Sequence, residues 1–108
     1  MASFTVRIEL NDAGPADHAT VEEAMKVEGF VRTIKSDEGI TYLLPTYEYS
    51  RRGEFTRDDV IEAAKRAASK RSANFSVLVT ESNGRKWFGL PKIEEAEGPL
   101  SGPSDTAK

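Results

Sequence analysis

The chain of 108 residues contains no cysteine. That absence excludes disulfide bonds, zinc–thiolate sites and a cysteine nucleophile, and it is typical of a cytoplasmic protein, which is the location we expect. Histidine is almost absent too, since His18 is the single copy. One histidine cannot supply a histidine-rich metal site, and no serine motif accompanies it as in a catalytic triad. The glycines stand in turn sequences, so no phosphate-binding loop is present.

Long hydrophobic runs and an excess of positive charge are also missing. No apolar run approaches the roughly 18–20 residues that a transmembrane helix needs, so we expect no membrane partner. The amino terminus shows no basic segment followed by an apolar block, so we expect no signal peptide. The formal net charge is −3. Binding of nucleic acid by bulk charge needs many Lys and Arg contacts to phosphate, so a nucleic-acid site here must be a local patch.

The first half of the chain predicts a strand, a helix and a hairpin. Residues 4–10 alternate apolar and polar side chains, the period of a half-buried strand. A helix is expected over 16–28, because its apolar residues share one face and Gly29 follows it. Residues 30–44 predict a hairpin whose three-residue loop pairs Ile34 with Tyr42.

The second half predicts a helix and a second hairpin. Thr56 is a good N-cap, and many alanines in the following helix allow close approach to a sheet. Residues 73–82 alternate again, as in a strand. Asn83-Gly84 is a strong hairpin signal, and it predicts a short fifth strand over 85–90.

The order of these elements predicts an α+β fold of ferredoxin-like βαββαβ type, a two-layer sandwich with a short extra C-terminal strand. Both helices are expected on one face of an antiparallel sheet. We expect one domain over residues 1–91. Residues 92–108 contain Gly, Pro, Ser and acidic residues but little to bury, so they are expected to form a flexible tail.

The stretch "TYEYSRRGEF" is the strongest candidate for a binding surface. It combines aromatic rings with guanidinium groups, the pairing used to bind single-stranded nucleic acid. The candidate residues are Tyr47, Tyr49, Arg51, Arg52 and, at the start of the second helix, Arg57. The alternative is that the tyrosines continue the third strand beyond Pro45 and pack at the edge of the sheet.

The sheet face that the helices leave open offers a second surface. Its predicted residues lack the stacking aromatics of an RNA-recognition motif, so that class is not expected. Part of the face is apolar, and a homodimer could bury it. The candidate dimer residues are Leu43, Leu78 and Trp87.

One carboxylate is a candidate metal ligand. Asp12 follows the first strand at the end of the sheet and could hold Mg²⁺, particularly if a dimer brought two copies together. The alternative is ordinary turn chemistry, because Asn-Asp after a strand commonly leads into a helix. Apart from Mg²⁺ in a nuclease, the residues indicate no cofactor and no small-molecule ligand.

The segments "SFTVRIEL", "GFVRTIKSDEGITYLLPTYEY" and "FSVLVTESNGRKWFGL" together resemble small bacterial proteins related to the endoribonuclease antitoxins of type V toxin–antitoxin systems. The resemblance covers about residues 3–91. It implies a ferredoxin-like fold similar to Cas2 nucleases and cleavage of a toxin messenger RNA. It also places an acidic residue at the end of the first strand, for which Asp12 is the nearest match.

Two functions remain open from the sequence. The first is an RNA-binding, antitoxin-like endoribonuclease. The second is a non-catalytic homodimeric module that binds another protein. The net negative charge and the lack of a catalytic motif favour this second function.

Overall fold

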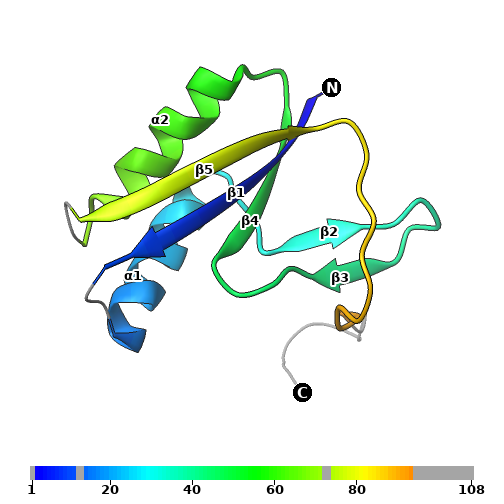
Figure 1. The fold of residues 1–108 in the computed structure, drawn as a ribbon, viewed down its shortest axis with the longest axis horizontal. Helices are drawn as coiled ribbons and strands as arrows, with labels where there is room; N and C mark the ends of the chain where they lie inside the picture. The colour runs from blue at the N-terminus through cyan, green and yellow to red at the C-terminus, as the bar shows by residue number, and fades with distance from the viewer. Residues whose placement is uncertain (1, 12–13, 72–73, 94–108) are drawn as a thin grey trace.

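The computed structural model describes residues 2–11, 14–71 and 74–93 (Figure 1). The elements in chain order are β1 (Ala2–Leu10), α1 (Pro15–Val27), β2 (Thr33–Lys35), β3 (Thr41–Leu43), β4 (Glu48–Gly53), α2 (Arg57–Ala68) and β5 (Phe75–Ser82). All strand pairings between these elements are antiparallel. The chain is therefore a small mixed α+β domain with two helices and an antiparallel sheet.

The main sheet has three strands in the order β4-β1-β5, with β1 in the centre. The predicted alternation of β1 is confirmed, because Phe4, Val6, Ile8 and Leu10 are buried while Arg7 and Glu9 are exposed. Val6 lies opposite Tyr49 of β4 and opposite Val79 of β5. One face of the sheet therefore belongs to the core and the other faces outward.

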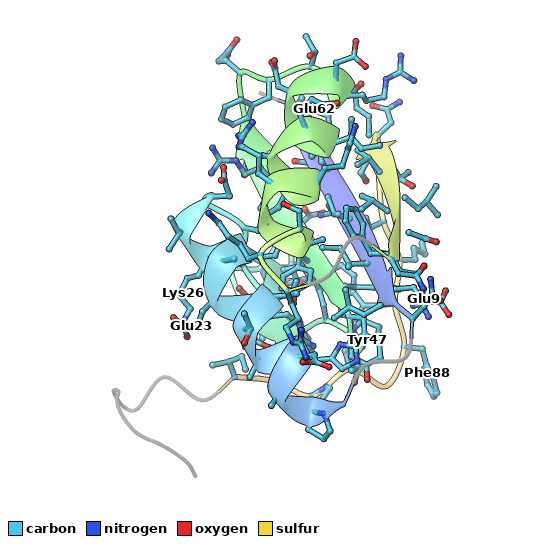
Figure 2. The ribbon with its side chains drawn as sticks, turned by 90° about the vertical axis from the view of Figure 1, so that its left-hand side faces the viewer. Glu9, Glu23, Lys26, Tyr47, Glu62 and Phe88 are labelled. Atoms are coloured by element: carbon cyan, nitrogen blue, oxygen red, sulfur yellow. The ribbon has the colours of Figure 1, made fainter. Side chains whose placement is uncertain are left out.

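Both helices lie on the same side of the main sheet, as Figure 2 shows. The N-terminus of α2 has a capping box, in which Thr56 Oγ1 accepts from the Asp59 N–H at 3.0 Å and the Asp59 carboxylate accepts from the Thr56 N–H at 2.9 Å. Small side chains let α2 approach the strands closely. The buried residues of the shared core are Phe4, Val6, Ile8, Leu10, Val21, Met25, Phe30, Tyr49, Val60, Ala64, Ala67 and Ala68.

Helix α1 ends as its glycine predicts. Gly29 has a φ of +97°, its N–H donates to the carbonyl of Lys26, and the Phe30 N–H reaches back to the carbonyl of Met25 at 2.9 Å. This pair of bonds is the Schellman motif, which needs a left-handed residue at the position of Gly29. The reversal directs Phe30 into the core.

Strands β2 and β3 form a separate two-stranded sheet. The predicted register is confirmed, because Ile34 pairs with Tyr42. The hairpin joins the main sheet at Ser50 of β4, which exchanges backbone hydrogen bonds of 3.0 and 2.7 Å with Val31 and donates its Oγ to the carbonyl of Thr33 at 2.7 Å.

The end of the described chain lies along the outer edge of β3. The Leu43 N–H donates to the carbonyl of Pro91, and the Ile93 N–H donates to the carbonyl of Thr41. Lys92 thereby forms an isolated bridge with Tyr42. Two residues at the start of the expected tail, Lys92 and Ile93, are thus hydrogen-bonded or bridged to the hairpin.

Arg32 closes the bend between the two sheets. Its Nε donates to the carbonyl of Glu48 at 2.9 Å, and its Nη2 donates to the carbonyls of Leu44 and Pro45 at 2.9 and 3.1 Å. The guanidinium group therefore binds backbone oxygens at a bend where the chain leaves one sheet for the other.

Two further expectations are corrected. The predicted single sheet is absent in the described residues: the main sheet has three strands, and its order differs from the expected one because residues 48–53 form a separate strand, β4, beside β1. The predicted strand over 85–90 is also wrong, since these residues form no strand. Arg85 bonds to Thr5, and Trp87 packs on Tyr42, so the chain crosses toward the hairpin instead of pairing with β5.

Candidate nucleic-acid interface

Strand β4 divides the tyrosine- and arginine-rich stretch between two faces of the sheet. Tyr49 and Arg51 point toward the helices, because they pair with the core residues Val6 and Phe4 of β1. Arg52 pairs with Ser3, which places it on the outward face. The five predicted binding residues therefore do not form one surface. Alternation of side chains within the strand separates them.

Arg51 is held against the end of α1. Its Nη1 donates to the carbonyl of Gly29 at 2.9 Å, and its guanidinium carbon lies 4.3 Å from the centre of the Phe55 ring and 5.9 Å from that of Phe30. These contacts form one wall of a groove of about 410 Å³ beside α2, where Glu28 and Arg66 form a two-pronged ion pair. Arg51 thus supports the fold where the sequence suggested RNA binding.

The other predicted residues lie at separate places. Tyr47 has a φ of 71°, unusual for a residue other than glycine, and its ring stacks on His18 with centres 4.2 Å apart. Arg57 lies at the start of α2, where its Nε is 3.5 Å from the carboxylate of Glu81. Asp12, the predicted metal ligand, lies outside the described residues.

Tyr49 is a core residue, with 5% of its surface exposed. Burial is the main cause that raises the pKa of its phenol to about 12, and the carboxylate of Glu22 adds to the effect, while Arg32 opposes it. The neutral phenol is therefore the form that the folded protein accommodates.

This burial predicts a pH dependence of stability at the alkaline end. Because the phenol titrates near pH 10 when unfolded and near 12 when folded, the native state loses stability as the pH rises through this window, by about 2 kcal/mol. Urea unfolding at a series of pH values measures this loss. The Tyr49→Phe variant should match the wild type at neutral pH and lose less between pH 10 and 12. Equal losses in the two proteins would contradict the assignment.

The outward face of the main sheet is ordered in rows across the strands. Figure 1 looks onto this face, with both helices behind it. At the end nearer the amino terminus, Ser3 lies between Arg52 and Ser82. In the next row Thr5 lies between Ser50 and Thr80, and further along, Arg7 of β1 binds Glu48 of β4 at 3.3 Å. Hydroxyl groups therefore dominate one end of the face and an ion pair lies toward the other.

Arg85 reaches back onto the hydroxyl end of this face. Its Nε donates to Thr5 Oγ1 at 3.0 Å, while its buried Nη2 has no hydrogen-bond acceptor among the described residues. Burial lowers the pKa of the guanidinium group, with no carboxylate to offset the effect. A buried donor of this kind generally finds a partner. We refer to Ser3, Thr5, Arg52 and Arg85 as the arginine patch.

Of the residues predicted for a dimer face, two lie at the hairpin and one lies on the main sheet. Leu43 belongs to β3, and Trp87 packs edge-on against Tyr42 of the same hairpin, with ring centres 5.3 Å apart. Leu78 lies on β5 and is 63% exposed. Phe88, which no sequence pattern singled out, is 100% exposed, and Figure 2 shows it on the same side of the molecule as Glu9.

Sequence reasoning also missed Arg85 as a functional candidate. The alternation of "YEYSRR" indicates that Arg52 faces away from Tyr49 and Arg51, so this residue could have been placed by counting along a strand. Arg85 follows a turn, and only the contact with Thr5, 80 residues away in the chain, places it on the sheet. No local pattern carries that information.

Comparison of the chain with protein-family models gives no match, and comparison with curated proteins gives none either. Within the described parts of the chain, no group of three or more His, Cys, Asp or Glu side chains could hold a metal ion. No helix in those parts is long and apolar enough to span a membrane.

Proposed function

We propose that the protein binds single-stranded RNA, and that the arginine patch on the outward face of the main sheet holds the phosphate backbone. The chemistry is that of a guanidinium group donating to phosphate oxygens, with neighbouring hydroxyl groups as further donors. Of the five residues predicted to bind RNA, the proposal keeps only Arg52, and it adds Arg85 from the segment after β5.

The observation that carries the proposal is the distribution of unpaired arginines. Across the described residues, ion pairs neutralise Arg7, Arg32, Arg57, Arg66 and Arg71. Arg51 is held by a carbonyl and two rings. Arg52 and Arg85 form no ion pair in that part of the chain, and both lie at the hydroxyl end of the outward face. Two cations left without carboxylates on one surface favour an anionic ligand.

The segment that follows Arg85 suits a single strand. Phe88, three residues further along the chain, offers a fully exposed ring on which a base can stack, and stacking is tolerant of sequence because every base has a π-face. A carboxylate lies further along the face, at Glu9. Its negative charge disfavours phosphate there and would confine the backbone to the arginine patch.

Fluorescence anisotropy with a labelled single-stranded RNA tests the proposal. We expect binding at low salt that weakens as salt rises, with a slope of log affinity against log salt of about −0.7 per phosphate contact. The Arg52→Ala plus Arg85→Ala protein should lose two contacts and flatten this slope by about 1.4. Lys65→Ala, which removes a positive charge from the helix-covered side, serves as the control.

Two outcomes would contradict the proposal. The first is a wild-type protein that shows no RNA affinity at low salt. The second is binding that survives the double substitution but fails in Arg57→Ala, because that result would return the site to the loop and the start of α2.

The same reactions also test whether the protein cleaves RNA, which the antitoxin resemblance implies. Intact RNA after incubation with Mg²⁺ would limit the function to binding. Cleavage that Asp12→Ala abolishes would extend the proposal to an endoribonuclease that uses this carboxylate as a Mg²⁺ ligand.

A second candidate function is a non-catalytic homodimeric module that binds another protein. The exposed Leu78 on an edge strand favours it, because edge strands with apolar side chains readily pair with another chain. The two candidates make separate predictions, since one requires the arginine patch and the other requires β5.

A further inference from the structure

We propose that two copies of this chain pair through the free edge of β5, in an antiparallel register centred on Leu78. The inference deepens the second candidate function and does not depend on RNA binding. It joins two three-stranded sheets into one continuous sheet of six strands.

The hydrogen-bonding pattern identifies the groups that point outward from this edge. The Asn11 N–H donates to the Asn74 carbonyl at 3.1 Å, so Asn11 and Asn74 continue the β1–β5 register as a hydrogen-bonded pair. Bonded and non-bonded pairs alternate along an antiparallel ladder. The even-numbered residues of β5 therefore bond to β1. The N–H and C=O groups of Phe75, Val77, Val79 and Glu81 point to the free edge.

The free edge of β5 lacks the features that normally prevent an edge strand from pairing with another chain. Strand β5 has eight residues, contains no proline and no lysine or arginine, and has a single charged side chain, Glu81, near its end. The other edges among the described strands are better covered. Val31 bonds to the outer side of β4, and the segment 91–93 bonds to that of β3. Long unprotected edges of this kind readily accept another strand.

The strand is complementary to itself. A two-fold axis at Leu78 pairs Val77 with Val79 of the second copy and places the two Leu78 side chains directly opposite each other. The valine pair exchanges backbone hydrogen bonds, because both residues have outward groups. The leucine pair is then a non-hydrogen-bonded pair, in which side chains lie closest, with Cα atoms about 4.5 Å apart. The same register therefore provides both the valine pair and the leucine pair.

Charge also favours the antiparallel arrangement. Glu81, the one charged side chain of β5, lies near the C-terminal end of the strand. Antiparallel pairing keeps the two Glu81 side chains at opposite ends of the interface. A parallel pairing would place them together.

Sedimentation equilibrium over a range of concentrations tests the pairing. The wild type should reach twice the monomer mass of 11.9 kDa. In Leu78→Lys the apolar contact is replaced by two opposed like charges, so the dimer dissociation constant should rise about a hundredfold. Val27→Lys is the matched control, because Val27 is 86% exposed on α1, away from the edge, and this variant should dimerise as the wild type does.

A charge-swap experiment tests the register itself. Leu78→Lys and Leu78→Glu should each be monomeric, and an equimolar mixture of the two should restore the dimer, because opposite charges then face each other across the axis. Circular dichroism of each variant confirms that it is folded. The inference fails if the wild type stays monomeric at all concentrations. It fails equally if both single variants still dimerise, or if folded variants do not associate when mixed. RNA binding by a monomeric protein would overturn this inference alone.

Discussion

Replacing Phe4 with alanine is expected to lower the free energy of unfolding by about 4 kcal/mol, because the change empties the centre of the core. Phe4 is 0% exposed and lies on the central strand of the main sheet, on the face that the helices cover. Removing its ring sacrifices the burial of an aromatic side chain and leaves a cavity that a sheet bonded on both sides cannot close.

The same substitution at another phenylalanine gives the control. Phe88→Ala removes an identical ring from a position that is fully exposed, so it should change the free energy of unfolding by less than about 0.5 kcal/mol. Urea unfolding followed by circular dichroism measures both. A loss below about 1 kcal/mol for Phe4→Ala would mean that this ring is not at the centre of the core.

Replacing Gly29 with alanine is expected to cost about 3 kcal/mol, for two separable reasons. The first is backbone strain, because the φ of +97° lies in the left-handed region that L-residues avoid. The second is a collision, because a Cβ on Gly29 would meet the guanidinium of Arg51. That side chain can swing away, but it then gives up the bond to the Gly29 carbonyl and its position over the Phe55 ring.

A second glycine separates the two reasons. Gly39 has a φ of +88°, and nothing lies near the position of its missing Cβ, so Gly39→Ala measures the strain alone, at about 1–2 kcal/mol. The excess cost of Gly29→Ala should disappear when Arg51 is already alanine. A double-mutant cycle of Gly29→Ala and Arg51→Ala, followed by urea unfolding, measures the coupling free energy between the two positions. Equal costs for the two glycines in the wild-type background would show that Arg51 moves aside without loss.

Local patterns predicted those parts of the fold that depend on neighbours in the chain. The alternation of β1, both helices and the pairing of Ile34 with Tyr42 follow from periodicity, caps and one loop glycine. These signals act over a few residues, and the structure agrees with each of them.

The predictions failed for segments whose structure depends on contacts between residues far apart in the chain. Asn83-Gly84 encodes a reversal, but a hairpin also needs a returning strand, and Arg85 and Trp87 instead bond to Thr5 and pack on Tyr42. The sequence offered a strand at the tyrosines only as a continuation of the third predicted strand beyond Pro45, whereas β4 is a separate strand. Its partner, β1, is about forty residues away. The division of the candidate RNA residues between two faces follows from that missed strand.

The bend closed by Arg32 has a consequence for how the two sheets are joined. Three carbonyl oxygens at this corner accept from one side chain instead of from a neighbouring strand. A planar fork of fixed donors can serve several oxygens at once, whereas a lysine ammonium would act as a single point charge. The hairpin is thus held to the main sheet by this cation together with the hydrogen bonds that Ser50 makes to Val31 and Thr33. A lysine at position 32 could not serve all three carbonyl oxygens, so the corner would depend on Ser50 alone.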